Sequence, residues 1–417
     1  AAAGNSEIQY RLAESYRRIY NYAQAAEAYE RLLKGTDAAA YPEARYGYAV
    51  ALRAMGKPAE AKAQLEQYLQ GNGANKAAAQ LELQSIAFAE TEGKNPAAAQ
   101  YTVARMAEPL NGAETNYAAQ WSGGSLLFTS TRPDSLQKGK SGNLYANRIY
   151  TGAPGGAVTA LPLASADGTE QGAASMSPDG NRIYFTRWSY DGGTPVSTIY
   201  MSQKSGDSWS EPKALGDAIN ATGASARQPF VTPDGQYLLF ASNRPGGIGG
   251  YDIWAAPISG DNFGAAQNLG ASVNTPEDEE APFYHSPSKT LVFASRGRVG
   301  MGGLDLYSAQ GNVSGGFAAA QNLGFPVNSN KDDSYFSTAS ADRLLKGAVI
   351  SSDRGQDACM SLYSVDKQYR QFVAGKVVDC ASQQPVAGAQ VQVDGRSGTT
   401  AADGSYLVEV AAFTNTS

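Results

Sequence analysis

The sequence predicts a multidomain chain that is α-helical at its start and β afterwards: a helical-repeat solenoid, a β-propeller of five blades and a partial β-sandwich. Three observations lead to this fold class. Only 7 of the 46 Gly residues lie in the first 110 residues, which are Ala-rich and repeat after 36 residues. Short β-branched and aromatic runs punctuated by Gly and Pro follow, with a period near 55 residues. The predicted domains are residues 1–108, 109–370 and 371–417.

The N-terminal segment contains two copies of a helical pattern. The stretch IQYRLAESYRRIYNYAQAAEAYERLL returns 36 residues later, in a weaker form, as ARYGYAVALRAMGKPAEAKAQLEQYL. Large and small residues occupy the positions of the tetratricopeptide pattern, with Leu12, Ala13 and Tyr16 expected to pack inside the repeat. A third helical stretch within residues 77–106 is expected to supply the further unit that a solenoid needs. The alternative is a generic helical bundle.

One face of this helical segment is predicted to bind a partner. Charged and aromatic residues at positions i, i+3, i+7 and i+10 of the first helix share a face, and most of them recur 36 residues later. Tyr beside paired charges has the composition of an interaction hot spot. The alternative is an ordinary solvated helix face. The predicted groove consists of Glu7, Tyr10, Glu14, Arg17, Glu43, Tyr46 and Arg53.

Five copies of a β unit follow the helical segment. Three are clear, SMSPDGNRIYFTR, VTPDGQYLLFASNR and HSPSKTLVFASRGR, and two are outlying, WSGGSLLFTSTR and ASADRLLKGAVISSDR. Each unit contains enough short strands for one four-stranded blade. A sixth blade would require an unrecognised copy in residues 151–169 or 366–375. The buried position of each copy is predicted to be Phe128, Phe185, Phe240, Phe293 and Ile350, with spacings of 57, 55, 53 and 57 residues.

Arg and Asp recur at the ends of the repeated strands, and we predict structural roles for them. Such residues pair with each other or with backbone groups of their own blade, which closes each unit in the same way. The alternative is a ring of charges that binds a ligand. The residues are Arg132, Arg244, Arg296, Arg354, Asp252 and Asp305.

Composition argues against several classes of function. A single His excludes HExxH metalloproteases, and neither a Gly-x-Ser-x-Gly elbow nor a phosphate-binding loop is present. The acidic run at residues 276–280 lacks the spacing of a calcium loop. A net charge of −6 argues against nucleic acid, and no apolar run is long enough to span a membrane. We therefore expect no enzyme activity, no metal and no cofactor.

The repeats carry a family resemblance. The β unit resembles the TolB-like, Asp-Leu-Tyr type of propeller repeat, which is related to WD repeats. The forms GGIGGYDIW and NLGASVNTPEDEEAPF resemble repeats of large outer-membrane-associated proteins of Bacteroidetes. The tail VAGKVVDCASQQPVAGAQVQVDGRSGTTAADGSYLVEV resembles the carboxypeptidase regulatory-like domain. This order of segments is similar to that of type IX secretion system components.

The resemblance implies a non-enzymatic periplasmic scaffold, associated with the outer membrane, that contacts other envelope proteins of the secretion machinery. In such components an OmpA-like domain, expected beyond this sequence, binds peptidoglycan. Any export signal is expected to have been removed, since the first residues lack a charged start and an apolar stretch. An oxidising compartment would permit a disulfide between Cys359 and Cys380. The alternatives are a periplasmic peptide- or glycan-binding propeller protein, with its ligand in the central channel, and the gating propeller of a hydrolase.

Overall fold

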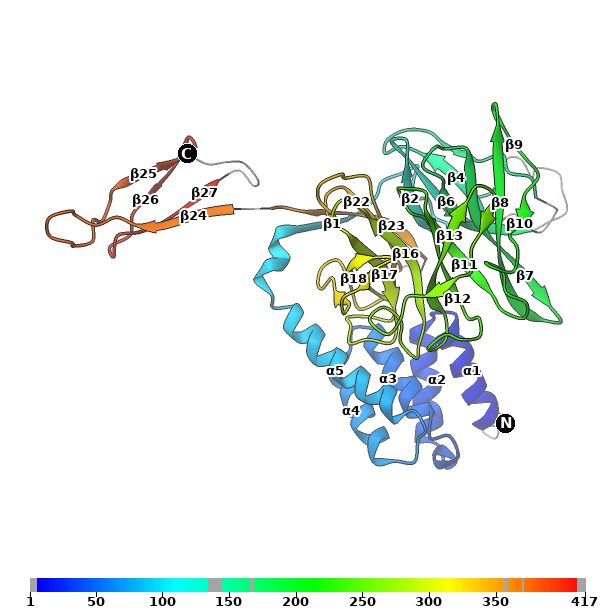
Figure 1. Ribbon diagram of the computed structural model, residues 1–417. Helices are drawn as coiled ribbons and strands as arrows, with labels where there is room; N and C mark the ends of the chain where they lie inside the picture. Colours follow the sequence, from blue (N-terminus) through cyan, green and yellow to red (C-terminus); the bar gives the residue numbers. More distant parts are fainter. Residues whose placement is uncertain (1–5, 134–144, 166–168, 356–358, 370, 411–417) are drawn as a thin grey trace. The chain divides into compact units, whose positions relative to one another are not determined.

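The computed structural model describes residues 6–133, 145–165, 169–355, 359–369 and 371–410 (Figure 1). The chain folds into two compact units. One is formed by Ala1–Ala98 with Val103–Asp366, and the other by Ala99–Thr102 with Lys367–Ser417. The N-terminal helices and the propeller therefore belong to the same unit.

The described N-terminal residues form five α-helices, each packed on the next along the chain. Ala13 and Ala25 are fully buried, and their small side chains let the first two helices pack closely. The Oδ1 atom of Asn21 accepts a hydrogen bond from the backbone N–H of Gln24 and so caps the second helix. The helices are α1 (Ser6–Arg18), α2 (Tyr22–Lys34), α3 (Ala44–Ala54), α4 (Pro58–Gln70) and α5 (Lys76–Glu92), with a 3-10 turn η1 (Ala38–Ala40).

The prediction of a helical-repeat solenoid is wrong. The described chain has only five helices, of 11 to 17 residues, whereas a repeat array needs three or more units to bury a continuous core. Of the stretch expected to supply the third unit, only the first half is α-helical, as α5; the second half forms a 3-10 helix η2 (Pro96–Gln100) and then strand β1 (Tyr101–Arg105), which joins the propeller. Leu12, expected inside the repeat, is 44% exposed.

Five antiparallel sheets form the blades of a propeller, which confirms the five-blade prediction. The apolar marker of each repeat lies on the second strand of its blade and is at most 1% exposed. Blade 1 contains β2 (Asn116–Ser122), β3 (Ser125–Ser130), β4 (Arg148–Gly152) and β5 (Val158–Ala160). Blade 2 contains β6 (Glu170–Met176), β7 (Arg182–Asp191), β8 (Thr194–Ser205) and β10 (Lys213–Ala214), with β9 (Ser208–Trp209) paired to β8.

The other three blades repeat this plan. Blade 3 contains β11 (Ala226–Val231), β12 (Tyr237–Ser242) and β13 (Asp252–Ser259), with β14 (Asn262–Phe263) and β15 (Gln267–Asn268) paired to β13. Blade 4 contains β16 (Glu279–His285), β17 (Thr290–Ser295) and β18 (Asp305–Asn312), with β19 (Gly316–Phe317) and β20 (Gln321–Asn322) paired to β18. Blade 5 contains β21 (Asp333–Thr338), β22 (Ala348–Ser352) and β23 (Ser361–Lys367).

Strand β1 completes blade 5, although it precedes blade 1 in the sequence. It pairs with β23, and the sheet order is β1-β23-β22-β21. The backbone N–H of Met106, just after β1, donates to the carbonyl of Leu362 at 2.9 Å. Blade 5 therefore combines residues from both sides of the repeat region, which closes the ring and removes a free sheet edge.

The inner strand of every blade contains one non-glycine residue with a positive φ angle, between 46° and 57°. Each lies at a β-bulge, where the register with the neighbouring strand shifts. In three blades its backbone N–H donates to a hydroxyl of the preceding blade, as in the 2.8 Å bond from Ala173 to Thr129 Oγ1. These residues are Ala118, Ala173, Gln228, Ala281 and Tyr335.

The C-terminal unit consists of short antiparallel pairs. Strand β24 (Gln371–Lys376) pairs with β27 (Ser405–Val410), and β25 (Gln390–Val393) pairs with β26 (Arg396–Thr399). The predicted partial β-sandwich is thus reduced, in the residues described, to two two-stranded sheets. Throughout the described chain, every helix is too short or too polar to cross a membrane.

Candidate functional site

Two residues of the predicted groove contact neighbours within the helices. The Glu7 carboxylate pairs with the Arg11 guanidinium one turn later on α1, at 2.5 Å. The ring of Tyr10 packs on the ring of Tyr41, with the ring centroids 5.2 Å apart. Both contacts lie inside the helical part of the chain.

Two further groove residues, Glu14 and Glu43, accept hydrogen bonds from tyrosine hydroxyls. The Glu14 carboxylate accepts one from Tyr29 and pairs with Arg17 at 2.8 Å. The Glu43 carboxylate accepts one from Tyr68 at 2.7 Å. These bonds link α1 to α2 and α3 to α4, so both carboxylates hold helix pairs together.

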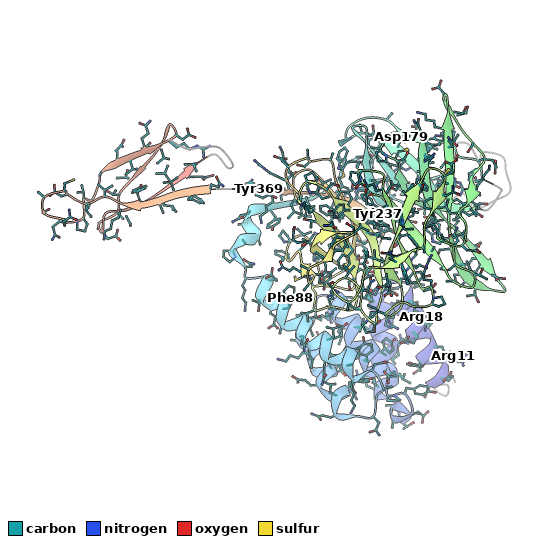
Figure 2. The ribbon with its side chains drawn as sticks, viewed as in Figure 1. Arg11, Arg18, Phe88, Asp179, Tyr237 and Tyr369 are labelled. Atoms are coloured by element: carbon teal, nitrogen blue, oxygen red, sulfur yellow. The ribbon has the colours of Figure 1, made fainter. Side chains whose placement is uncertain are left out.

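The other groove residues, Arg17, Tyr46 and Arg53, line a cavity of about 570 Å³ between the helices and the propeller. Figure 2 shows Arg18 at the end of α1 that meets the propeller, and Arg11 further from it. The helices contribute Arg17, Arg18, Tyr20, Tyr22, Tyr46, Val50, Arg53, Ala77, Leu81 and Glu82, among others, and the propeller loops contribute Pro276, Glu277, Arg296, Arg298, Asn330 and Lys331.

Arg53 fixes the helices to the propeller at one wall of this cavity. Its Nε atom pairs with the Glu82 carboxylate on α5 at 2.6 Å, and its Nη2 atom donates to the carbonyl of Gly302 at 2.6 Å. Beside it, the N–H of Gly300 donates to Ser85 Oγ at 3.1 Å. Only 11% of the Arg53 side chain is exposed, so this residue holds the wall in place.

Three tyrosines, Tyr20, Tyr22 and Tyr46, also line the cavity. Tyr20 lies in the turn between α1 and α2, has a φ of 61° and is 40% exposed. The ammonium of Lys331 lies over the ring of Tyr22, 5.1 Å from its centroid. Burial raises the pKa of the Tyr22 and Tyr46 hydroxyls, so both remain protonated and can donate hydrogen bonds at neutral pH.

Blade 4 exchanges the roles of two arginines. In blades 3 and 5, Arg244 and Arg354 donate to carbonyls of the preceding loop. In blade 4, Arg298 does this, with hydrogen bonds to the carbonyls of Ser272 and Val273 at 3.2 and 2.9 Å. Arg296 instead pairs with Asp332 at 3.0 Å and lines the cavity. The sequence pattern predicts Arg296 at the repeated position, and Arg298 takes that role instead.

The remaining repeated polar residues make contacts inside the propeller. Arg132 donates to the carbonyls of Pro109 and Leu110 at 2.9 and 2.7 Å. The Asp252 carboxylate accepts a hydrogen bond from the Asn268 side chain at 2.8 Å.

Asp305 repeats the role of Asp252 in blade 4. Its carboxylate accepts a hydrogen bond from the Asn322 side chain at 2.8 Å. Burial raises the pKa of Asp305 to about 7, although hydrogen bonds from Met301, Asn322 and Gly302 oppose the shift. These are contacts that close a blade.

The centre of the propeller is nearly filled. Residues of all five inner strands enclose a volume of only about 30 Å³. Ala118, Ala173 and Ala281 contribute to this lining with Gln228 and Tyr335. This part of the channel is therefore narrow, and the alternative of a propeller that binds a peptide or a glycan stays a prediction.

The two cysteines are free thiols in this structure. Cys359 is half-buried and Cys380 is exposed. They belong to different units of the chain, and the disulfide stays a prediction. Intact mass under non-reducing conditions would test it. Elsewhere in the described chain, no group of three or more His, Cys, Asp or Glu side chains is placed to hold a metal ion.

Sequence reasoning missed Tyr20, Tyr22, Arg298 and Lys331 as cavity residues. The only local signal was the density of Arg and Tyr in RRIYNY at the end of α1. The propeller residues lie more than 200 positions later in the chain, so only the packing of helices on blades 4 and 5 brings the two sets together.

Neither a protein-family model nor a curated protein matches this sequence. Solved structures are similar to it in part. TolB from Acinetobacter baumannii is 17% identical with a TM-score of 0.36, covering 61% of this chain and 55% of that one. An endo-arabinase from Bacteroides thetaiotaomicron is 15% identical with a TM-score of 0.40, covering 64% and 94%. An α-L-arabinofuranosidase from Lactobacillus brevis is 13% identical with a TM-score of 0.43, covering 63% and 92%. Such values transfer no activity, and the chain is a five-blade β-propeller with TolB-like structural neighbours.

Proposed function

We propose that this chain is a non-enzymatic binding protein that holds a peptide segment of a partner protein in the cavity between its helices and its propeller. The observation that carries this proposal is the lining of the cavity, in which the Tyr side chains come from the helical segment and the Arg side chains from both parts. Tyr and Arg are enriched at the centres of protein interfaces, because they provide contact area together with hydrogen-bond donors.

The size of the cavity supports a bound segment. Its volume of about 570 Å³ falls within the range of pockets that enclose small ligands. Arg53 and Glu82 hold one wall rigidly, so little conformational entropy remains to be lost there when a ligand binds.

The non-enzymatic part of the proposal rests on the chemistry of the lining. The single His of the chain, His285, is held by Ser288 Oγ at 2.7 Å and the Ser340 carbonyl at 2.8 Å, and it lines a different hollow. The described lining of the cavity contains no His, so it offers no imidazole for acid–base catalysis.

The test uses substitutions that fill the cavity. The full chain is used to select binders from a phage-displayed library of random dodecapeptides. Ala77→Trp places a large ring in the lining on α5, whereas Gln80→Trp places the same ring on an exposed part of that helix outside the cavity. We expect Ala77→Trp to lower the affinity of the selected peptides by about tenfold or more, because the new ring blocks contacts with the cavity lining. Gln80→Trp should leave binding unchanged.

If the selected peptides bind both variants equally well, the cavity is not the binding site. Circular dichroism and thermal unfolding of both variants show whether the fold is intact. A selection that enriches no peptide, while a panel of soluble glycans binds, would replace the proposal with glycan recognition.

A second candidate is a scaffold role in type IX secretion, on the periplasmic side of the outer membrane. It is favoured by the repeats GGIGGYDIW and NLGASVNTPEDEEAPF, which resemble those of Bacteroidetes envelope proteins, and by an order of segments similar to that of PorE. The partners would then be other envelope proteins of the machinery. Deleting the gene should stop secretion of cargo proteins, and unchanged secretion would remove this candidate.

A further inference from the structure

The charge of the cavity lining differs in sign from the charge of the chain. The whole sequence has a net charge of −6. The lining contains two carboxylates, Glu82 and Glu277, but six cationic side chains. These are Arg17, Arg18, Arg53, Arg296, Arg298 and Lys331.

Some of these cations are neutralised by carboxylates. Arg53 pairs with Glu82 at 2.6 Å, and Arg296 pairs with Asp332, which is 3% exposed, at 3.0 Å. Arg17 and Arg18 share the single Glu14 carboxylate, at 2.8 and 3.9 Å. One positive charge of this last group is therefore left without its own carboxylate.

Two further cations have neutral partners. Arg298 donates to two backbone carbonyls, and its buried Nε atom has no hydrogen-bond partner among the described residues. Lys331 lies over the Tyr22 ring. Glu279 and Asp353 act on Arg298 and Lys331, respectively, through longer-range electrostatics. The described part of the chain contains no ion pair for either cation within 4.0 Å.

We infer that the cavity binds an acidic segment of polypeptide, whose carboxylates are held by Lys331 and the arginines of the lining. This inference rests on the proposed function and names the class of its ligand. Lys331 and Arg298 have no carboxylate partner among the described residues. A carboxylate that enters the cavity can therefore accept charge-assisted hydrogen bonds from them. The hydroxyls of Tyr22 and Tyr46 add neutral donors beside these cations.

A peptide fits these observations better than a nucleic acid. The lining contains both cationic groups and tyrosine rings, which suits a chain with both carboxylate and apolar side chains. A long polyanion would instead experience the net charge of −6 outside the cavity. Nucleic-acid binding is therefore an outcome of the test that would overturn the inference.

The experiment measures fluorescence anisotropy of labelled dodecapeptides with the full chain. The acidic probe contains three copies of Glu-Tyr-Glu-Gly, the neutral probe has Gln in place of Glu, and the basic probe has Lys. We expect the acidic probe to bind about tenfold or more tightly than the neutral one, with an affinity that falls as NaCl is raised.

Charge-reversal variants locate the binding. Lys331→Glu should lower the affinity of the acidic probe by about tenfold or more, because the carboxylates of the probe then meet a like charge at position 331. Lys289→Glu makes the same change of charge on an exposed turn outside the cavity, and it should change affinity by less than about twofold. If Lys331→Glu does not fold, Lys331→Met removes the charge and should still weaken the acidic probe.

The outcomes separate the two proposals. Equal binding of acidic and neutral probes, lost in Ala77→Trp, would leave the binding function intact and overturn the acidic-ligand inference. Probe binding that is insensitive to both Ala77→Trp and Lys331→Glu would overturn both. A labelled single-stranded oligonucleotide that binds more tightly than the acidic probe, and loses affinity in Lys331→Glu, would also overturn the inference.

Discussion

Glu279 shows how one buried side chain ties the stability of blade 4 to pH. Its carboxylate accepts hydrogen bonds from Thr275 Oγ1 at 2.7 Å and Ser295 Oγ at 2.6 Å, and it is fully buried. Burial nevertheless raises its pKa to about 7. In blade 1, Asn116 faces Ser130 as Glu279 faces Ser295, so a neutral amide already occupies the matching position there.

The first prediction concerns this group. Because the pKa of Glu279 is higher in the folded than in the unfolded chain, the folded state holds more protons between pH of about 4 and about 7. Its contribution to the free energy of unfolding is complete below that window and is lost as the pH rises through it. Asp305 and Asp353, with pKa values raised by burial to about 7 and about 6, act in the same direction. Glu279→Gln should make the free energy of unfolding fall less steeply as the pH rises through this window.

Urea unfolding at several pH values, followed by circular dichroism, measures this slope. Asp179→Asn is a suitable control, since its exposed carboxylate has a lowered pKa, mainly through the hydrogen bond from Ser177. An identical slope in Glu279→Gln and in the parent chain would contradict the prediction.

The repeated arginines differ in the groups that would lose a hydrogen-bond partner if the arginine were replaced. Arg354 pairs with Asp333, which is 0% exposed, and also donates to the carbonyl of Val327. Arg244 donates to the carbonyl of Ala218 at 2.9 Å and has no carboxylate partner in the described residues.

We predict that Arg354→Ala lowers the free energy of unfolding more than Arg244→Ala does. Loss of Arg354 strands a buried carboxylate, which costs about 3–5 kcal/mol, whereas loss of Arg244 removes hydrogen bonds to neutral groups, worth about 1.5–3 kcal/mol. Chemical unfolding of both variants at neutral pH compares them. Equal losses would indicate that Asp333 finds other donors.

Strand β1, of five residues, closes the ring of blades. It lies before blade 1 in the sequence but pairs with β23 of blade 5, and the carbonyl of Ala104 accepts a hydrogen bond from Ser364 Oγ at 3.3 Å. Ring closure therefore depends on a segment that the sequence assigned to the helical domain.

We predict that Val103→Pro combined with Ala104→Pro opens this closure. Consecutive residues of a strand alternate in the direction of their N–H groups, so one of the two prolines must remove a donor that faces β23. Amide hydrogen exchange of β22 and β23 should become faster, while that of β12 and β13 in blade 3 should change little. Unchanged exchange in blade 5 would show that β1 does not close the ring.

The complete ring makes a further prediction. The inner strands contact one another in the order β2, β6, β11, β16, β21 and back to β2, so each blade buries its faces against two others. Deleting residues 226–278, from the start of β11 to the residue before β16, removes one blade. The remaining four should fail to unfold as a single cooperative transition, because two blade faces are left exposed. A cooperative transition of unchanged midpoint would contradict the closed ring.

The helices and the propeller form one unit, and the candidate site depends on that arrangement. The lining of the cavity comes from residues 17–85 and 276–331. Arg53, which reaches the Gly302 carbonyl from α3, is one of the contacts that join them.

The five-fold repeat was readable in the sequence because it is a local pattern. Buried Phe residues recur at fixed spacing, and Ser-Pro-Asp-Gly turns mark where strands end. Short-range chemistry of this kind specifies strands, turns and the number of blades. It also identified Arg17, Tyr46 and Arg53, three of the seven residues predicted for the groove, which line one side of the cavity.

Only the tertiary structure decided how these elements meet. It turned the expected solenoid into five helices packed on blades 4 and 5, placed β1 in blade 5, and exchanged Arg296 for Arg298 at the repeated position. The physical reason is that each of these outcomes depends on contacts between residues far apart in the chain. Five short helices leave apolar surface uncovered, so they pack on a neighbouring surface, and no local pattern in the sequence specifies which surface that is.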